Sequence, residues 1–380
     1  MCADSFQPAS PLAEGGRDEF FMRRALAQAV RAWGDTAPNP MVGAVLVRDG
    51  RVVAEGYHHR DGAAHAEIDC LRKVGFDARG CDMYVTLEPC TTKGRTGACS
   101  DAIIASGVSR VVVGCKDVNP AHSGRAEKVF AARGIKTHFG VLERECFELN
   151  FIFNKNITSG ESLLAVKYAS TSDGFITRKR GERAQITGEA ARRDVMKWRR
   201  LFQSIGVGFG TLVADNPSLT VRDESGIVIG CGARLIFDGA LRCADLSDLS
   251  RFNVFSDEFR ERTRVVCGAD ASAERESALA SRGVSVMRVN APSKADFWAE
   301  LKRRLFAERI CSLYVEGGAG VFASVCEGRA ADYVFEYVSE ISFGEGLPAF
   351  DKKYFSIDAV ERADFGCDKF ARGYPIWTQK

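Results

Sequence analysis

His65-Ala66-Glu67, then Pro89-Cys90, and then Cys99 after eight intervening residues form the stretch that decides the fold of the first half of the chain. One imidazole and two thiolates are ligands that zinc prefers, and three protein ligands leave its fourth tetrahedral position open. Each of these residues alone would more often belong to an ordinary helix start or a packed core. Together and in this order, they predict a catalytic metal site where a strand leads into a helix.

The residue beside the predicted ligands indicates what such a site does. Zinc lowers the pKa of a bound water molecule to about 7, so hydroxide is available at neutral pH. A carboxylate must then take a proton from that water and give one to a departing amine, and Glu67 stands two residues after His65. The zinc deaminase signature H-x-E…P-C-x-x-C has the same order, although only two residues separate its cysteines. We predict that His65, Cys90 and Cys99 bind Zn²⁺ and that Glu67 transfers protons in a hydrolytic deamination.

Strands and helices alternate around these residues. The apolar pattern predicts helices over 20–32, 65–74, 100–106 and 127–132, and strands over 41–47, 51–55, 83–87 and 110–114. Asp49-Gly50, between the first two strands, is a strong hairpin signal. This alternation is typical of a layered α/β fold.

Composition limits the classes of protein to which the chain can belong. Its 380 residues exceed one ordinary domain, and 46% hydrophobic with 27% charged residues is typical of a soluble globular protein. The formal net charge of +2 gives no reason to expect a nucleic acid or an anionic membrane as partner. Apolar runs fall short of the roughly 20 residues that span a bilayer.

The cysteines and the N-terminal segment favour a cytoplasmic protein. Thirteen scattered cysteines, an odd number in a long chain, are not the framework of a small disulfide-rich domain. Residues 1–17 are polar and lack the basic start and apolar core of a signal peptide. We expect most of the thiols to be reduced and buried.

The second half of the chain repeats the alternation after a polar stretch. Residues 150–161 are the best linker candidate, which places the domains at 17–150 and 161–380. Strands are expected over 162–169, 205–209, 234–237, 264–267, 284–289, 312–315 and 333–338, and helices over 189–202 and 294–306.

Polar residues and glycines follow several of these strands. They occur in the stretches 167–174, 210–222 and 315–320. Ligands of α/β folds bind past the carboxyl ends of strands, and glycines before a helix let a phosphate approach backbone N–H groups. Taken alone, these stretches are more often plain turns, and they lack the G-x-G-x-x-G fingerprint of a dinucleotide-binding βαβ unit.

The motifs together closely resemble one family over nearly the whole chain. Asn39-Pro40-x-Val42-Gly43, His65-Ala66-Glu67 and the segment 87–99 are similar to those of the bifunctional riboflavin-biosynthesis deaminase–reductases. The resemblance implies an N-terminal cytidine-deaminase-like α/β/α sandwich and a C-terminal α/β domain of dihydrofolate-reductase-like fold. The implied substrate is a small phosphorylated pyrimidine that carries a phosphoribosylamino group.

The resemblance also assigns roles to residues of both halves. In the first half, Asn39 and His58 would hold the substrate and Arg95 its phosphate, which a planar guanidinium matches bidentately. The second half would reduce the ribosyl group to a ribityl chain with NADPH. The residues expected to contact the cofactor are Ala169, Gln185, Thr211, Asp215, Gly318, Ala319 and Gly320. Those expected to contact the substrate are Arg183, Arg199, Leu219, Arg222 and Glu316.

The chain departs from the family pattern at several positions. Thr92 replaces a usual histidine, Gly97-Ala98 replaces two prolines, and Val118 replaces a proline. Arg183 and Gln185 stand where bacterial relatives tend to have Ser and Trp, and the missing aromatic ring is expected to weaken cofactor stacking.

Two alternatives therefore stay open. One is a deaminase whose second half binds a ligand without reducing it. The other is a nucleic-acid base deaminase, which would favour closely spaced cysteines and a basic surface. The sequence leaves the oligomeric state undetermined, although a homo-oligomer is compatible with such a fold.

Overall fold

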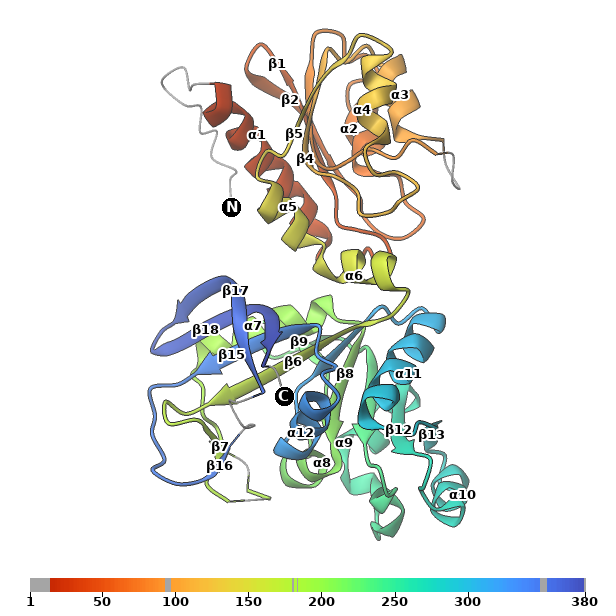
Figure 1. The fold of residues 1–380 in the computed structure, drawn as a ribbon, viewed down its shortest axis with the longest axis vertical. Helices are drawn as coiled ribbons and strands as arrows, with labels where there is room; N and C mark the ends of the chain where they lie inside the picture. Colours follow the sequence, from red (N-terminus) through yellow and green to blue (C-terminus); the bar gives the residue numbers. More distant parts are fainter. Residues whose placement is uncertain (1–13, 93–96, 180, 183, 349–353, 379–380) are drawn as a thin grey trace. The chain divides into compact units, whose positions relative to one another are not determined.

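The computed structural model describes residues 14–378 apart from 93–96, 180, 183 and 349–353. The chain forms two compact units, Met1–Thr158 and Ser159–Lys380 (Figure 1). None of the described helices combines the length and apolar character needed to cross a membrane.

Unit 1 is built on a five-stranded sheet of order β2-β1-β3-β4-β5. Its strands are β1 (Gly43–Arg48), β2 (Arg51–Tyr57), β3 (Asp82–Leu87), β4 (Arg110–Cys115) and β5 (Lys136–Phe139). The β1–β2 hairpin predicted at Asp49-Gly50 is confirmed, and both turn residues have positive φ, as a two-residue hairpin loop requires. Strands β3, β4 and β5 run parallel, so their carboxyl ends meet at one edge.

Helices cover both faces of this sheet, as predicted for an α/β/α sandwich. They are α1 (Glu14–Ala29), α2 (Ala66–Arg72), α3 (Cys99–Ala105), α4 (Arg125–Ala131), α5 (Glu143–Leu149) and α6 (Phe151–Ser159). Alternate residues of β1 enter different cores. Ala44 and Leu46 pack with residues of α2, α3 and α4, whereas Val45 and Val47 pack with α1 and α5.

The packing of α1 on β1 explains why position 43, in the motif Asn39-Pro40-x-Val42-Gly43, is a glycine. A Cβ atom there would lie 2.0 Å from the backbone oxygen of Ala25, so only glycine lets α1 pack this closely on β1. The motif therefore contributes to packing as well as to the site.

The polar stretch predicted as a linker contains the division between the two units, but most of it is helical. Helix α6 extends to Ser159, and the division between the units falls after Thr158. Asn154 is buried and its amide donates to Phe147 O at 2.9 Å, while Thr158 Oγ1 donates to Asn154 O at 2.8 Å. Polar side chains that satisfy helix carbonyls gave this helix the composition of a loop.

Unit 2 is built on a nine-stranded sheet of order β13-β12-β11-β8-β14-β6-β15-β18-β17. The strands expected from the sequence all form, as β6 (Leu163–Ser170), β8 (Ser204–Gly208), β11 (Ala233–Phe237), β12 (Thr263–Gly268), β13 (Ser285–Val289), β14 (Ser312–Val315) and β15 (Tyr333–Val338). All of these run parallel.

The sequence did not indicate the antiparallel hairpin that ends this sheet. Its strands are β17 (Phe355–Phe365) and β18 (Asp368–Trp377). Strand β17 lies at the sheet edge, where only its first residue, Phe355, is buried, and apolar and charged residues are mixed along it. Two small two-stranded sheets were also not expected: β7 (Phe175–Thr177) pairs with the distant β16 (Leu347–Pro348), and β9 (Val221–Arg222) pairs with β10 (Val228–Gly230).

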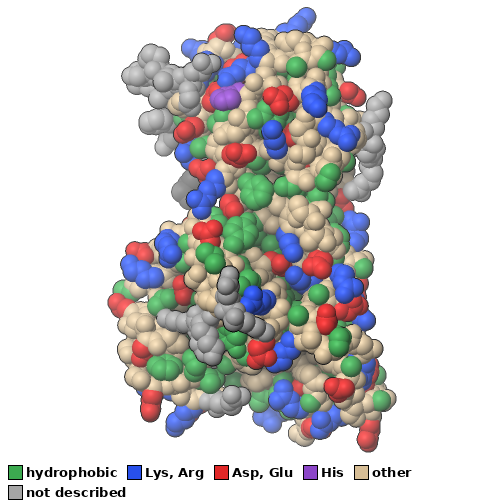
Figure 2. All heavy atoms as spheres, viewed as in Figure 1, with side chains coloured by type: hydrophobic (Ala, Val, Ile, Leu, Met, Phe, Trp, Pro, Cys, Tyr) green, Lys and Arg blue, Asp and Glu red, His purple; other side chains and the backbone are tan. Residues whose placement is uncertain are grey.

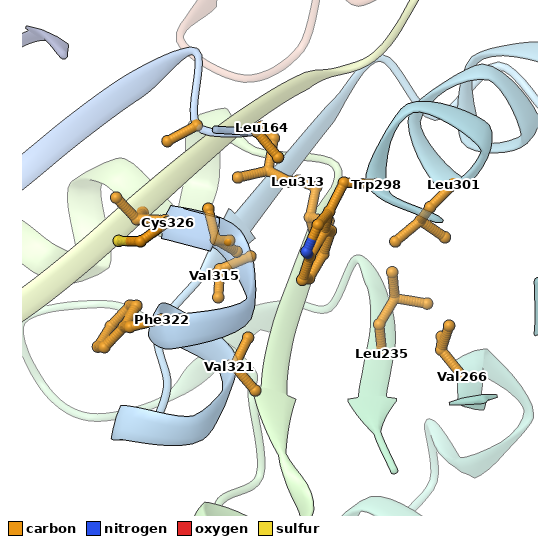
Figure 3. Close-up of a cluster of buried hydrophobic side chains, with 14 of the residues drawn as sticks. Leu164, Leu235, Val266, Trp298, Leu301, Leu313, Val315, Val321, Phe322 and Cys326 are labelled. Atoms are coloured by element: carbon orange, nitrogen blue, oxygen red, sulfur yellow. The ribbon is translucent and has the colours of Figure 1, made fainter. Parts of the chain in front are cut away.

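Helices pack on both faces of the large sheet as well. They are α7 (Glu189–Leu201), α8 (Phe209–Asp215), α9 (Asn253–Ser256), α10 (Ala273–Ser281), α11 (Lys294–Ala307) and α12 (Ala319–Glu327). In the larger core, Trp298 of α11 and Phe322 of α12 pack with Leu235 and Leu313 of the strands (Figure 3). The neighbouring residue Ile236 enters the core on the other face.

Candidate functional site

The three predicted zinc ligands of unit 1 converge on one point. His65 immediately precedes α2, Cys90 follows β3, and Cys99 begins α3. His65 Nδ1 lies 3.7 Å from Cys90 Sγ and 3.2 Å from Cys99 Sγ, and the ligand atoms all lie within 4.8 Å of one another. The Cys99 backbone N–H donates to Cys90 Sγ at 3.3 Å. One nitrogen and two sulfurs at these separations fit a tetrahedral zinc ion with one open position.

The electrostatics of this cluster favour a metal and a proton carrier. Hydrogen bonding by the Cys99 thiol, and then by His65, lowers the pKa of Cys90 despite its burial, whereas the same hydrogen bond raises the pKa of the Cys99 thiol, so that the pair holds one proton without a metal. A thiolate is the form of cysteine that binds metal. Glu67 is 3% exposed, and its burial, with the charge of Cys90 added, raises the pKa of its carboxyl to about 7. Glu67 is therefore suited to both accept and donate a proton near neutral pH.

Two predicted substrate residues, Asn39 and His58, lie together beside the ligands. Asn39 Nδ2 is 3.3 Å from His58 Nε2 and donates to Asp61 Oδ1 at 3.0 Å. Burial lowers the pKa of His58, so its ring is neutral at pH 7. His58 Nδ1 lies 3.0 Å from Ala64 O, which assigns the ring proton to Nδ1 and leaves Nε2 to accept from Asn39. Its ring stands edge-on to that of His65, at 5.6 Å between centroids.

Sequence reasoning missed Asp61, although the stretch that leads from Gly56 into His65 contains it. A single aspartate in a loop carries no signal by itself. Only the fold shows that its carboxylate orients the amide of Asn39. Arg95, the predicted phosphate contact, lies outside the described residues.

A second missed residue, Glu88, supports the loop that follows β4. Its buried carboxylate accepts backbone N–H groups from Asp117 at 3.3 Å, Gly124 at 3.0 Å and Ala126 at 3.0 Å. Glu88 stands two residues before Cys90, so the same turn holds a predicted ligand and the 117–126 loop. The sequence shows Glu88 beside Pro89, but not the segment that it binds.

Unit 2 contains a cavity of about 1270 Å³ past the carboxyl ends of its parallel strands. Its walls include every residue predicted to contact the cofactor, namely Ala169, Gln185, Thr211, Asp215, Gly318, Ala319 and Gly320. Of the predicted substrate contacts, Arg199 and Glu316 also line it. Leu219 is buried elsewhere, Arg222 is exposed on β9, and neither lines the cavity. Arg183 lies outside the described residues.

A buried ion pair forms part of this cavity. Arg199 of α7 donates from Nε and Nη2 to the two carboxylate oxygens of Glu316, at 2.6 and 2.7 Å. Burial favours the neutral form of Glu316, but the Arg199 guanidinium more than offsets it and holds the pKa of Glu316 below its usual value. Both side chains are therefore charged at neutral pH.

Lys167 of β6 is a cavity residue that the sequence did not single out. It stands at the start of one stretch noted for its turn, but its position on the strand suggested packing. Burial lowers the pKa of its ammonium, and the charge of Glu316 only partly opposes this shift. The structure thus places a proton donor of reduced pKa in the cavity.

The glycine turn before α12 brings two predicted cofactor positions together. Gly318 has φ +66°, and a Cβ atom there would lie 2.8 Å from Thr211 Oγ1. A side chain at this position would be strained and would also displace Thr211. The turn that precedes α12 therefore approaches α8 closely only because residue 318 is glycine.

Family models match both units. A model of the cytidine and deoxycytidylate deaminase zinc-binding region matches residues 16–115. A model of the RibD C-terminal domain matches residues 162–369.

Curated relatives and solved structures match over most of the chain. The riboflavin biosynthesis protein RibD of Bacillus amyloliquefaciens is 34% identical over 335 residues, covering 87% of this chain and 86% of the relative. RibD of Aquifex aeolicus is 34% identical, with 90% and 92% covered. The diaminohydroxyphosphoribosylaminopyrimidine deaminase/5-amino-6-(5-phosphoribosylamino)uracil reductase of Thermotoga maritima has a TM-score of 0.78 at 34% identity, over 96% of this chain and all of that structure. Acinetobacter baumannii RibD also has a TM-score of 0.78, at 29% identity and the same coverage.

Proposed function

The chain belongs to the RibD family of bifunctional riboflavin-biosynthesis enzymes, and from this premise we propose that residues 17–150 carry its deamination and residues 161–380 its reduction. The family fold is a cytidine-deaminase-like domain followed by a dihydrofolate-reductase-like domain. The enzyme is a zinc-dependent deaminase and an NADPH-dependent reductase that acts on a small-molecule substrate. The roles of individual residues follow as proposals from the geometry.

In the deaminase, His65, Cys90 and Cys99 hold the zinc ion. When bound there, zinc supplies a Lewis acid that makes a water molecule nucleophilic near neutral pH. Glu67 takes the proton of the attacking water and delivers a proton to the departing ammonia. Its buried carboxyl, with a pKa near 7, supports both transfers. The convergence of three ligand side chains beside this carboxyl is the single observation that carries the assignment.

The substrate of the deaminase is a phosphorylated pyrimidine, and residues beside the metal ligands select it. Asn39, oriented by Asp61 and His58, presents its amide to the edge of the base. His58 is proposed to act on the substrate through Asn39, whose amide it holds with Nε2, and its neutral ring adds no charge next to the metal ligands. Arg95 is proposed to bind the phosphate, since a guanidinium matches phosphate oxygens bidentately.

In the reductase, the cavity of unit 2 holds NADPH and the deaminated product together. Its volume of about 1270 Å³ exceeds the range of about 300–1,000 Å³ that is typical for one small ligand. A cofactor bound there would supply the hydride for C1 of the ring-opened ribosyl imine, whose nitrogen would also need a proton. Lys167 is proposed to supply that proton, while Arg199 and Glu316 orient the polar groups of the substrate.

Cellular setting and assembly are further proposals. Twelve described cysteines are all free thiols, which supports a reducing, cytoplasmic compartment. Lys, Arg, Asp and Glu are interspersed on the visible face of each unit, which supports a small-molecule substrate rather than a nucleic acid (Figure 2). We also propose a homo-oligomer, which is compatible with a fold of this kind.

The decisive experiment measures zinc content and both activities on the purified full chain. We expect stoichiometric zinc, deamination of the phosphoribosylamino-pyrimidine, and loss of NADPH absorbance when the deaminated product is added. Gln185 in the cavity predicts slower reduction than in relatives with an aromatic ring there. Deamination without any NADPH oxidation at high enzyme concentration would leave only the binding role of unit 2.

A further inference from the structure

Asn150, at the end of α5, holds the backbone of the segment that carries Asn39. Its side-chain Oδ1 accepts the Met41 backbone N–H at 2.8 Å, and its Nδ2 donates to the Met41 backbone carbonyl at 2.9 Å. The two residues are 109 positions apart in the chain, and both are buried. One side chain thus satisfies both backbone groups of Met41, as a neighbouring antiparallel strand would.

The backbone of Met41 needs this partner. Met41 precedes β1, whose registers with β2 and β3 begin at Gly43 and Ala44, so the sheet does not pair the backbone groups of Met41. A buried backbone N–H or C=O group without a partner is strongly disfavoured. The amide of asparagine offers a donor and an acceptor side by side, which a carboxylate, an ammonium or an alkyl group does not. The residue type at position 150 therefore matches what this stretch of backbone lacks.

Asn150 is itself held in place by the helices on both sides of it. It is the C-cap of α5, and α6 begins at the next residue. Its backbone N–H donates to Phe147 O at 3.1 Å, and its backbone oxygen accepts the Asn154 N–H at 2.8 Å. The two helices therefore fix the backbone of Asn150, and the two bonds to Met41 fix the plane of its amide. This support is in place before any ligand binds.

The chain between Met41 and Asn39 is stiff. Pro38 and Pro40 flank Asn39, and a proline ring fixes its own φ and restricts the residue before it. On the other side, the Asn39 backbone N–H donates to Thr36 O at 2.9 Å. Few bond rotations between Met41 and Asn39 can absorb a displacement, so a shift of Met41 would also shift Asn39.

The segment 39–42 also supports the other side chain of the proposed base contact. The His58 backbone N–H donates to Val42 O at 2.9 Å, and its ring Nε2 lies 3.3 Å from Asn39 Nδ2. The His58 ring in turn stands 5.6 Å from the ring of His65, a predicted metal ligand. The position of this segment therefore sets the distance between the base contact and the metal ligands, and one substrate must reach both.

We propose that Asn150 is a positioning residue of the deaminase, which places Asn39 where the pyrimidine ring can be bound and attacked. This inference rests on the proposed deaminase function and adds to it a residue that acts on the substrate only through Asn39. Such a residue matters because a displacement of about 1 Å in a binding group can lower the rate of an enzyme by about 10²-fold.

The test is a double-mutant cycle of Asn150 with Asn39 in the full chain. Asn150→Ala should lower kcat/KM for deamination of the phosphoribosylamino-pyrimidine about 10- to 100-fold, while zinc content and NADPH oxidation stay at wild-type levels. In an Asn39→Ala background, the same change should lower kcat/KM by no more than about twofold, because the side chain that Asn150 positions is absent. Losses that multiply in the double variant would overturn the proposal, as would full activity of Asn150→Ala.

Asn154 provides a matched control one helical turn further along the chain. It is also a buried asparagine, but its amide donates to Phe147 O at 2.9 Å and not to the segment that carries Asn39. Asn154→Ala should therefore lower the stability of unit 1 without changing kcat/KM for deamination. Equal losses of kcat/KM in both alanine variants would leave Asn150 a general structural role and overturn the proposal. Asn150→Asp keeps the size and the acceptor but not the donor, and replaces the alanine variant if that variant does not fold.

Failure of the proposed function gives a different result. A wild-type protein that binds zinc but does not deaminate the pyrimidine would refute the deaminase. Hydrogen–deuterium exchange of peptides that contain residues 39–43 would then still test whether Asn150 fixes this segment, because its Oδ1 protects the Met41 amide. Exchange should be faster than in the wild type in Asn150→Ala and unchanged in Asn154→Ala. Unchanged exchange in Asn150→Ala would overturn the inference by itself.

Discussion

The two sites of this enzyme are built in opposite ways. In unit 1, the proposed metal ligands and the proposed proton carrier come from residues 65–67 and 90–99, where neighbouring elements begin or end. In unit 2, the cavity collects residues from Lys167 to Leu347, and most parallel strands of the sheet contribute to it. The zinc site is therefore local in sequence, whereas the cavity exists only when the large sheet has formed. We expect substitutions at the proposed zinc site of unit 1 to affect chemistry without affecting the fold, and substitutions in the cavity of unit 2 to affect both.

The largest effect is expected from Glu67→Gln in unit 1. The amide keeps the size of the side chain but cannot carry a proton, so kcat for deamination should fall by a factor of about 10² to 10⁴. Zinc content should stay at the wild-type level, because Glu67 is not among the converging ligand atoms. Metal analysis, deamination and NADPH oxidation on one preparation would check this. Equal loss of both activities would contradict the independence of the two sites.

The second largest effect is expected from Glu316→Gln in the cavity of unit 2. Glu316→Gln removes one charge of the buried pair and leaves Arg199 without its carboxylate, which typically costs about 3–5 kcal/mol. Reductase activity and the unfolding transition of unit 2 should both decline, while deamination persists. The control is Arg193→Met on the same helix, since its pair with Glu189 is exposed and worth about 1 kcal/mol or less. A stable Glu316→Gln protein that lacks only reductase activity would show that the cavity is as modular as the zinc site.

The same contrast explains what the sequence could and could not predict. His65, Cys90 and Cys99 carry metal chemistry at a recognisable spacing, so their meeting was predictable from the order of residues. The strands of unit 2 were also predictable, because buried parallel strands are continuous apolar runs. The role of Lys167 was not predictable, because a single lysine in an apolar run has no periodic signal. Its role becomes visible only when the fold brings it near Glu316, which is far away in the chain.

Residues that act through backbone groups were the least predictable. Glu88 binds N–H groups of Asp117, Gly124 and Ala126, and any residue type can offer an N–H group. The edge hairpin β17–β18 was missed for another reason, because its buried residues, such as Phe355 and Phe370, are interspersed with exposed charged residues and form no continuous apolar run. The helical form of α6 was not expected because Asn154 satisfies a carbonyl instead of adding to an apolar pattern.

The smallest effect is expected from a substitution of Asp18, which tests whether the stability of unit 1 is independent of unit 2. Asp18 of α1 is buried, with Arg110 donating to both its oxygens, Tyr84 donating at 2.8 Å and His138 Nδ1 at 3.0 Å. Burial favours protonation of Asp18, but these partners outweigh it and hold its pKa below the usual value. A lowered pKa in the folded state means that the unfolded chain binds more protons in acid. The stabilisation by Asp18 is therefore complete above its unfolded pKa of about 3.9 and is lost as the pH falls through the lower folded value.

Asp18→Asn should remove this contribution. At neutral pH the free energy of unfolding of unit 1 should drop by about 1–3 kcal/mol, since Arg110 loses a charged acceptor, and the fall in stability below about pH 4 should become shallower. Urea unfolding followed by loss of deaminase activity reports on unit 1, whereas NADPH oxidation should keep its wild-type midpoint. Asp77→Asn, an exposed partner of Arg79, should change neither quantity. The contrary outcome is a free energy of unfolding of Asp18→Asn that depends on pH as in the wild type. Carboxyl groups other than that of Asp18 would then govern the acid stability of unit 1, which would contradict the prediction.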